Sequence, residues 1–345
     1  MIKVLIVDDS QTVRFILSDI LSSDPDIQLI GAAGNGAEAL NILQRKKPDI
    51  ITMDINMPGI NGFDLTRKIM ETSPVPVVIV SSYCSPEDAQ MTFKALEAGA
   101  VGILEKPSVE LKNTEEMKKK FINTLKLMSE IKVIKRWTTR EKEIPVYRDE
   151  PSLKIKSSQI KVIAIGSSIG GPFALRTLLS GLSASVDVPL FIVQHIARGF
   201  IEGMIEWLKN DIKLPVHLAS HDIKPEGGHV YFAPDDFHME VGTNGLIRLR
   251  KAVAGEHICP SVSSLFRSVA HVYGSSSTGI LLTGMGTDGS AELKLMRDKG
   301  AITIAQDAQS SVVHGMPGEA IKLGGATYIL PPGDMAPLIM KLLKY

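Results

Sequence analysis

The chain lacks the features that mark secreted, membrane-embedded and nucleic-acid-binding proteins. Its 345 residues include only two cysteines, Cys84 and Cys259, which are too few for a disulfide framework. The formal net charge is zero, so no overall positive field favours a nucleic-acid partner. No run approaches the roughly 18 apolar residues of a membrane span, and the start MIKVLIVDDS meets two aspartates too early for a signal peptide. We therefore expect a monomeric cytoplasmic protein that does not insert into a membrane.

Two stretches of alternating apolar runs and helical patterns flank a polar segment, and the length suits two domains. The apolar runs of the first stretch are rich in Val, Ile and Leu, as in strands buried on both faces of a parallel sheet. These runs are KVLIVDD, IQLIGAA, DIITMDI, VPVVIVSS and VGILEKP. The same rhythm restarts at residue 159, and Asn244-Gly245 indicates an antiparallel hairpin.

The predicted fold class is therefore α/β, with two doubly wound domains. Residues 1–125 are expected to form a five-stranded parallel, flavodoxin-like domain. Residues 126–158 are interpreted as a linker, because Trp137 to Ser158 is polar, holds two prolines and has no clear period. Residues 159–345 are expected to form a mainly parallel α/β domain with an antiparallel hairpin.

Acidic side chains end two strands of the first domain. Asp8 and Asp9 follow the first strand, and Asp54 follows the third. Ligands of an open parallel sheet bind beyond the carboxyl ends of its strands. Three carboxylates gathered there repel one another unless a cation neutralises them, and Mg²⁺ prefers oxygen ligands. Each aspartate alone is more simply a solvated strand end, but Ser81 and Lys106 at two further strand ends favour a common site.

The first domain resembles a bacterial response-regulator receiver domain. The resemblance rests on Asp8-Asp9, Asp54 with Met57-Pro58-Gly59, Ser81, and Lys106-Pro107. It implies that Asp54 accepts a phosphoryl group from a histidine kinase, since a carboxylate can attack phosphorus while cations stabilise the charge. It further implies that Mg²⁺ is bound by Asp8, Asp9, Asp54 and the backbone carbonyl of Asn56, and that the phosphoryl oxygens contact Ser81 and Lys106. The family usually has an aromatic residue at the position of Ile103.

A glycine-rich turn follows the first strand of the second domain. The segment Gly166-Ser167-Ser168-Ile169-Gly170-Gly171 lies between an apolar run and a helical pattern. Such a turn exposes one serine and leaves backbone N–H groups free at the helix start, as an acyl-transfer enzyme requires. A phosphate or dinucleotide loop is disfavoured because neither GxxxxGK[ST] nor GxGxxG is present. A purely structural glycine turn remains the alternative.

A histidine and an aspartate end two further strands of the same domain. His195 closes the apolar run from Leu190, and Asp288 follows Gly279–Thr283 in a loop of glycines. Taken alone, the histidine is more simply structural and the aspartate a helix N-cap. Together with the serine, they lie at one edge of one sheet, which is what a Ser-His-Asp triad requires. The chain order Ser, His, Asp differs from the Ser, Asp, His order of α/β-hydrolases.

The second domain resembles the catalytic domain of the chemotaxis protein-glutamate methylesterase family, CheB. Besides the three residues, the resemblance rests on Ala233-Pro234, His238-Met239, Pro260-Ser261-Val262, Gln306-Asp307, and Ser310-Ser311-Val312-Val313 through Gly315-Met316-Pro317. It selects Ser168, not Ser167, as the nucleophile that attacks glutamyl γ-methyl esters of chemoreceptors, with methanol released. His195 would then move the proton and Asp288 would orient the imidazole.

The resemblance also places backbone N–H groups near Ile169 and Met285 in the oxyanion hole, and it implies glutamine deamidation by the same chemistry. It requires no cofactor in the hydrolase site. The family usually carries Thr where this chain has Ile169; a backbone donor survives that change.

The fusion of the two domains suggests that the first covers the Ser168 cleft until Asp54 is phosphorylated. The sequence leaves three other functions to consider. The main alternative is a receiver-regulated binding module without catalysis, which methanol release lost in Ser168→Ala would exclude. A general carboxylesterase would act on small activated esters. A DNA-binding effector is disfavoured because the second half is a long α/β domain without a compact basic recognition helix.

Overall fold

A computed structural model describes residues 1–81, 86–107, 115–131, 133, 160–253, 255–256 and 258–343. Most of the predicted linker, with Trp137, therefore lies outside the described residues, as do Cys84 and His257. None of the described helices is both long enough and apolar enough to cross a bilayer.

The N-terminal domain is a five-stranded parallel sheet with strand order β2-β1-β3-β4-β5, which confirms the predicted fold. Its strands are β1 (Ile2–Val7), β2 (Ile27–Ala33), β3 (Ile50–Met53), β4 (Val77–Ser81) and β5 (Gly102–Glu105). Its helices are α1 (Gln11–Ser22), α2 (Gly36–Arg45), α3 (Gly62–Thr72), α4 (Pro86–Glu97) and α5 (Glu115–Ser129). The last helix of this domain, α5, ends at Ser129.

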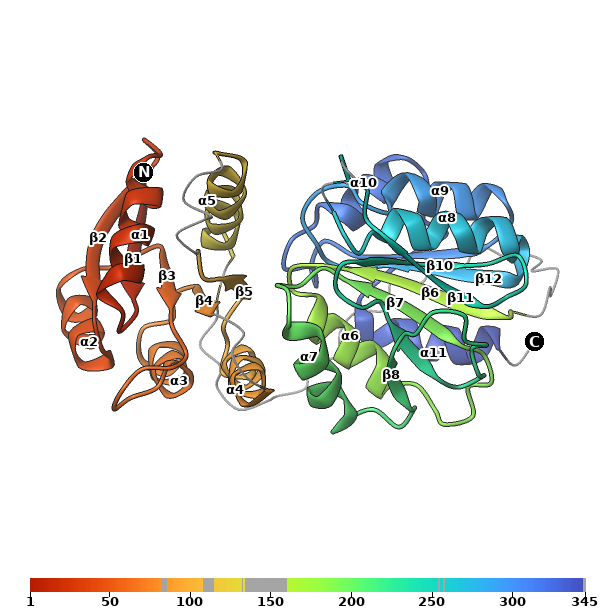
Figure 1. The fold of residues 1–345 in the computed structure, drawn as a ribbon, viewed down its shortest axis with the longest axis horizontal. Coiled ribbons are helices and arrows are strands. Elements are labelled where there is room, and N and C mark those ends of the chain that lie inside the picture. The colour runs from red at the N-terminus through yellow and green to blue at the C-terminus, as the bar shows by residue number, and fades with distance from the viewer. Residues whose placement is uncertain are drawn as a thin grey trace.

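The C-terminal domain contains a seven-stranded parallel sheet and a separate antiparallel hairpin, as expected (Figure 1). The sheet order is β14-β13-β12-β6-β7-β9-β8. The strands are β6 (Val162–Ser167), β7 (Leu190–Gln194), β8 (Val216–Leu218), β9 (Val230–Phe232), β10 (Phe237–Val241), β11 (Ile247–Lys251), β12 (Ser277–Leu281), β13 (Ile302–Gln306) and β14 (Tyr328–Leu330). The helices are α6 (Gly171–Ser180), α7 (Phe200–Lys209), α8 (Val262–Val272), α9 (Ser290–Asp298), α10 (Met316–Lys322) and α11 (Pro332–Leu342), with a short 3₁₀ turn, η2 (Gly274–Ser276).

Side chains of the central strands alternate between two apolar clusters. On β6, Ile163 and Ile165 pack into one cluster, whereas Val162 and Ala164 pack into the other. Helices α6, α7 and α11 cover the first face of the sheet, and α8, α9 and α10 cover the second (Figure 1). A strand with both faces buried carries apolar residues at every position, and this explains the uninterrupted runs in the sequence.

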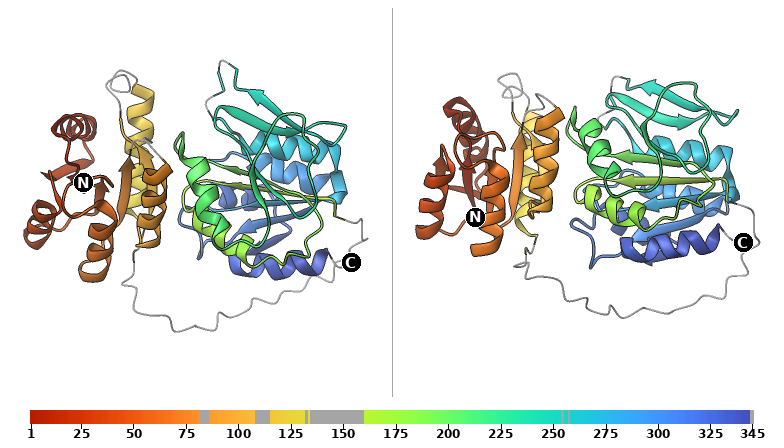
Figure 2. Two further views of the ribbon diagram at one scale, coloured as in Figure 1. Left: turned by 60° about the horizontal axis from the view of Figure 1, so that its bottom comes forward. Right: turned by 90° about the horizontal axis from the view of Figure 1, so that it is seen from below.

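The two domains contact each other through α4 and α7 (Figure 2). The ring of Phe93 on α4 stacks on Trp207 of α7, with the ring centroids 5.4 Å apart. A carboxylate oxygen of Glu97 accepts hydrogen bonds from Trp207 Nε1 at 3.0 Å and from Arg176 Nη1 at 3.1 Å. The guanidinium of Arg176 also lies over the Trp207 ring and pairs with Asp211. One aromatic pair and one shared carboxylate thus join the domains at this surface.

We predict that Phe191→Ala destabilises the C-terminal domain by about 3–5 kcal/mol, because Phe191 is fully buried on β7 and its removal leaves a cavity. Urea unfolding of the full chain, followed by circular dichroism, measures the loss. Leu323→Ala, at a position 44% exposed, serves as the control and should cost less than about 1 kcal/mol. Equal losses in the two variants would contradict the packing described for β7.

Candidate functional site

The acidic cluster of the N-terminal domain comes together as expected. Asp8 and Asp54 are buried, Asp9 is exposed, and oxygen atoms of the three carboxylates lie within 4.8 Å of one another. Lys106, which follows β5, places Nζ 2.9 Å from Asp8 Oδ2 and 2.8 Å from Asp54 Oδ2. One lysine therefore faces two buried carboxylates.

The electrostatics of this cluster favour a further cation. Burial raises the pKa of Asp54, and the hydrogen bond from Lys106 only partly opposes that rise. Burial alone would lower the pKa of Lys106, but the bonds to Asp54 and Asp8 outweigh it, and the net shift is upward. Because three carboxylates are only partly neutralised by one lysine, the oxygen-rich cluster fits Mg²⁺.

The other two residues assigned to this site lie at its margin. Ser81 is buried at the end of β4, and its carbonyl accepts the backbone N–H of Lys106 at 3.1 Å. The backbone N–H of Asn56 lies 3.3 Å from Asp54 Oδ1. The ends of β3, β4 and β5 therefore converge around Asp54.

In the C-terminal domain, the strand register brings Ser168 and His195 to the same edge of the sheet. Ser167, the last residue of β6, pairs with Gln194 at the end of β7. The next residues on the two strands are Ser168 and His195, and the backbone N–H of His195 donates to the Ser167 carbonyl at 2.9 Å. Gln194 fixes the turn, because its Nε2 donates to the Ser168 carbonyl at 2.8 Å.

The two adjacent serines have different environments. Ser167 is fully buried, and its hydroxyl donates to Gln194 Oε1 at 2.6 Å. Ser168 is 8% exposed, and its hydroxyl takes part in none of the hydrogen bonds found among the described residues. Only the Ser168 hydroxyl is thus free to react.

Glycines allow other backbone segments to approach this serine closely. Gly170 has a φ of 77°, in the left-handed region, and it directs the chain from the Ser168 turn into α6. A β-carbon on Gly284 would lie 2.6 Å from Ser168 Cβ. The loop after β12 can therefore lie against Ser168 only with glycine at position 284.

Asp288 is held by the start of α8. Its Oδ1 accepts from the Ser261 hydroxyl at 3.0 Å and from the Ser263 backbone N–H at 2.9 Å, and its Oδ2 accepts from the Val262 N–H at 2.7 Å. The sequence suggested an N-cap of the following helix as the simplest role, but the cap of α9 is Gly289. The Asp288 carboxylate instead binds the free N–H groups and the positive end of α8.

His195 completes a contact with that carboxylate. Its Nε2 lies 2.9 Å from Asp288 Oδ2. Burial would raise the pKa of Asp288, but the hydrogen bonds from His195 and Ser263 outweigh it and hold the pKa well below its usual range. Asp288 is therefore ionised at neutral pH and orients the ring, so that Nδ1 is the nitrogen left to accept a proton. No hydrogen bond joins Ser168 to His195 among the residues described, which is common before substrate binds.

Backbone donors lie beside Ser168 as well. The N–H groups of Ile169 and Met285 donate in none of the hydrogen bonds that the described residues form with one another. Ile169 is adjacent to Ser168, and Met285 follows Gly284, the residue in contact with Ser168. Both groups are thus available to a ligand at this edge of the sheet.

Sequence reasoning missed the residues that support the site. Gln194 and Ser263 were not recognised as partners of Ser168 and Asp288, and Ser261 was noted only as part of a motif. Of these residues, Ser261 was the easiest to predict from the sequence, because a serine before the apolar pattern VSSLFRSVAHV is typical of a helix N-cap. That this helix start meets Asp288 depends on contacts between residues 25 to 27 positions apart.

Comparison with known proteins identifies a family for each of the two domains. Residues 163–339 match the CheB methylesterase family, and residues 4–118 match the response regulator receiver domain. The chain is 47% identical over 344 residues to a protein-glutamate methylesterase/protein-glutamine glutaminase 1 of Syntrophus aciditrophicus, covering 99% of this chain and 98% of that protein. It is 48% identical over 347 residues to the corresponding enzyme numbered 4 of Geobacter metallireducens, covering 99% of each chain.

A solved structure is similar to the C-terminal domain. The crystal structure of the Thermotoga maritima CheB methylesterase catalytic domain is 32% identical in sequence to this chain, and the two superpose with a TM-score of 0.50. The matched region covers 54% of this chain and 98% of the Thermotoga chain. With two family matches and full-length relatives well above 30% identity, the chain belongs to the CheB methylesterase family and carries a response-regulator receiver domain at its N-terminal end.

Proposed function

We propose that this protein is a receiver-controlled hydrolase that removes methyl groups, as methanol, from glutamyl γ-methyl esters of chemoreceptors. The observation that carries the proposal is the edge of the seven-stranded sheet, where Ser168, His195 and an ionised Asp288 lie together. Its relatives named protein-glutamate methylesterase/protein-glutamine glutaminase support the same substrate class.

The reaction follows from the positions of these groups. Ser168 Oγ attacks the ester carbonyl carbon while His195 Nδ1 takes the hydroxyl proton. The N–H groups of Ile169 and Met285 stabilise the negative oxygen of the tetrahedral intermediate. The proton passes from His195 to the methoxy group, methanol leaves, and a Ser168 ester of the glutamyl chain remains. Water then attacks this ester with the same proton transfers and releases the carboxylate.

A glutamine side chain can enter the same sequence of steps. The amide carbon replaces the ester carbon, and ammonia leaves in place of methanol. The enzyme then converts selected receptor glutamines to glutamates, an activity that the printed names of the relatives include.

The receiver supplies the control. Asp54 is the phosphoacceptor for a chemotaxis histidine kinase, and Lys106 and Ser81 contact the transferred group. Asp8, Asp9, Asp54 and the carbonyl of Asn56 would hold Mg²⁺, which when bound neutralises charge on the phosphoryl oxygens. Lys106 contributes in the same way through the contact it already makes with Asp54.

The contacts between the domains support control by occlusion. Ile169, next to Ser168, packs against an apolar cluster of the receiver that includes residues of α1, α5 and the sheet. Helix α4, which contacts α7, is the element that follows Ser81 on β4. Phosphorylation at Asp54 would move Ser81 and α4 and shift the population toward receiver release.

We expect Ser168→Ala to lower methanol release from methylated receptor membranes by about 10⁴- to 10⁶-fold, because the variant has no nucleophile. Ser167→Ala is the matched control. This variant loses the buried hydrogen bond to Gln194, and its rate of methanol release should fall by no more than about tenfold. Retained activity in Ser168→Ala would instead support a binding module.

A small phosphodonor with Mg²⁺ should raise the methanol-release rate of the wild type at least about fivefold, since a shift of about 1 kcal/mol in the domain equilibrium suffices. Asp54→Asn should abolish this increase without changing the basal rate, and so should removal of Mg²⁺ by a chelator. Asp49→Asn, at the exposed residue just before the opposite end of β3, should respond like the wild type. A response that survives in Asp54→Asn would refute the assignment.

Glu97→Ala should raise the unphosphorylated rate about fivefold, because loss of its bonds to Trp207 and Arg176 weakens domain contact by about 1 kcal/mol. The control is Glu206→Ala, on the same helix as Trp207, where an exposed carboxylate forms an ion pair with Lys209. It should leave the rate unchanged. A lower rate in Glu97→Ala would argue against occlusion.

A further inference from the structure

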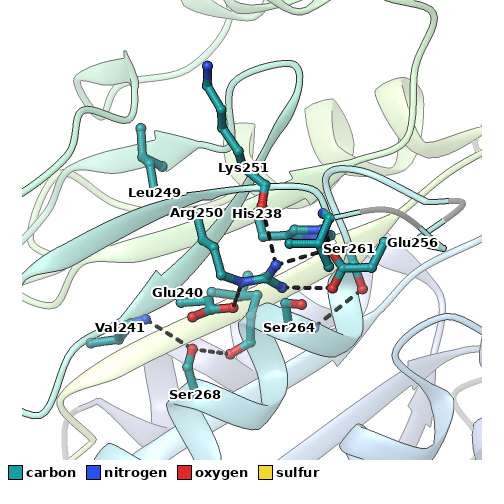
Figure 3. Close-up of polar contacts among 12 residues, drawn as sticks. His238, Glu240, Val241, Leu249, Arg250, Lys251, Glu256, Ser261, Ser264 and Ser268 are labelled. Carbon is teal, nitrogen blue, oxygen red and sulfur yellow. Dashed lines mark hydrogen bonds and ion pairs between the residues drawn. The ribbon is translucent and has the colours of Figure 1, made fainter.

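The β10–β11 hairpin carries a group of charged residues outside the triad (Figure 3). His238 on β10 and Arg250 on β11 pair directly in the strand register. Glu240, two residues further along β10, and Glu256, in the segment after β11, complete the group. We call these four residues the hairpin cluster.

Glu256 is the residue on which the hairpin cluster converges. Its Oε1 accepts from Arg250 Nη2 at 2.9 Å, and its Oε2 accepts from Arg250 Nη1 at 3.0 Å, so the pair is bidentate. Its Oε2 also accepts the backbone N–H of Val253 at 2.9 Å. The hydrogen bonds from Arg250 and Val253 lower the pKa of Glu256 to about 2. This carboxylate is therefore ionised throughout the neutral range, and it fastens its loop to the hairpin.

His238 fixes Glu256 from inside the protein. It is 1% exposed, and its Nε2 lies 3.1 Å from Glu256 Oε2. Because Glu256 is ionised, Nε2 carries the hydrogen and donates it. The other ring nitrogen is buried and has no partner among the residues described. The ring therefore makes its one hydrogen bond through Nε2, in the direction of Glu256.

In the chain, Glu256 shortly precedes the start of α8. Ser261, five positions after Glu256, is the N-cap of α8 and donates its hydroxyl to Asp288 Oδ1. A second contact joins the hairpin to the middle of α8, where the Val241 N–H donates to Ser268 Oγ at 3.0 Å. The hairpin thus contacts α8 directly at Ser268, and Glu256 ties the hairpin to the part of the chain that precedes α8.

We propose that Glu256, held by Arg250 and His238, is a positioning residue for Asp288. It touches no reacting atom, and it acts by fixing the first turn of α8, whose donors hold the Asp288 carboxylate against His195. The inference rests on the proposed function, since it assigns a further residue to the same reaction. Small displacements of a catalytic group cost rate, about 10²-fold for 1 Å.

The chain offers a closely matched pair of variants. Glu256 and Glu240 both pair with Arg250, but only Glu256 lies on the segment that leads to Ser261. In the full chain, Glu256→Ala should lower kcat for methanol release about 10- to 100-fold with KM changed less than about threefold. Glu240→Ala should keep kcat within about threefold of the wild type. Glu256→Gln keeps the shape of the side chain and can still accept hydrogen bonds, so its kcat should lie between those of the wild type and Glu256→Ala.

The comparison of the two alanine variants separates positioning from the loss of a charge beside Arg250. Equal kcat losses in Glu256→Ala and Glu240→Ala would overturn the proposal.

A readout without activity keeps the two proposals distinguishable. The hydrogen between His195 Nε2 and Asp288 should give a low-field proton resonance in the wild type and in Glu240→Ala. The resonance should weaken or vanish in folded Glu256→Ala, and its persistence there would refute the positioning role. If the wild type released no methanol, the proposed function would fail, while this resonance would still test the contact between His195 and Asp288.

Discussion

The chemistry of the C-terminal domain depends on one buried carboxylate and the helix start that holds it. Asp288 accepts hydrogen bonds from Ser261, Val262, Ser263 and His195. Removing an ionised carboxylate from water is costly unless donors replace the water, and the free N–H groups of a helix N-terminus are such donors. The position of α8 therefore decides where Asp288 lies and which way the His195 ring faces. Much of the surrounding architecture, including the antiparallel hairpin, supports that helix.

The buried carboxylates of the two sites differ in how far the protein compensates their charge. Around Asp288, four hydrogen bonds occupy the acceptor positions of the two carboxylate oxygens, and the pKa of Asp288 is lowered. In the receiver, Asp8 and Asp54 share a single lysine, and burial raises the pKa of Asp54. The Asp288 carboxylate is fully hydrogen-bonded by the protein itself. The receiver site is incompletely neutralised, which suits a site that takes up a cation and a phosphoryl group.

The contacts between the domains connect these two sites physically. The β4 strand ends in Ser81, and the next helix, α4, carries Phe93 and Glu97 to Trp207. On the other side, Ile169 lies beside Ser168 and packs against the receiver. One strand end and one helix therefore connect the Asp54 cluster to the surface of the receiver that contacts the C-terminal domain. The replacement of the usual Thr by Ile169 adds apolar surface to this contact and leaves the backbone donor intact.

The sequence alone determined the strands, because runs such as KVIAIGS and VPLFIVQH bury both faces in a parallel sheet. It also determined which residues end the strands. Because parallel strands end at one edge of their sheet, the sequence already grouped Asp8 with Asp54 in the first domain and Ser168 with His195 in the second. What holds Asp288 could not be predicted in this way. Asp288 contacts the start of α8, and Ile169 contacts the receiver. Like the ion pair between Glu256 and the hairpin, these contacts depend on how separate parts of the chain pack together. Only tertiary packing decides such contacts, because local periodicity records which face of an element is buried and carries no record of what lies against it.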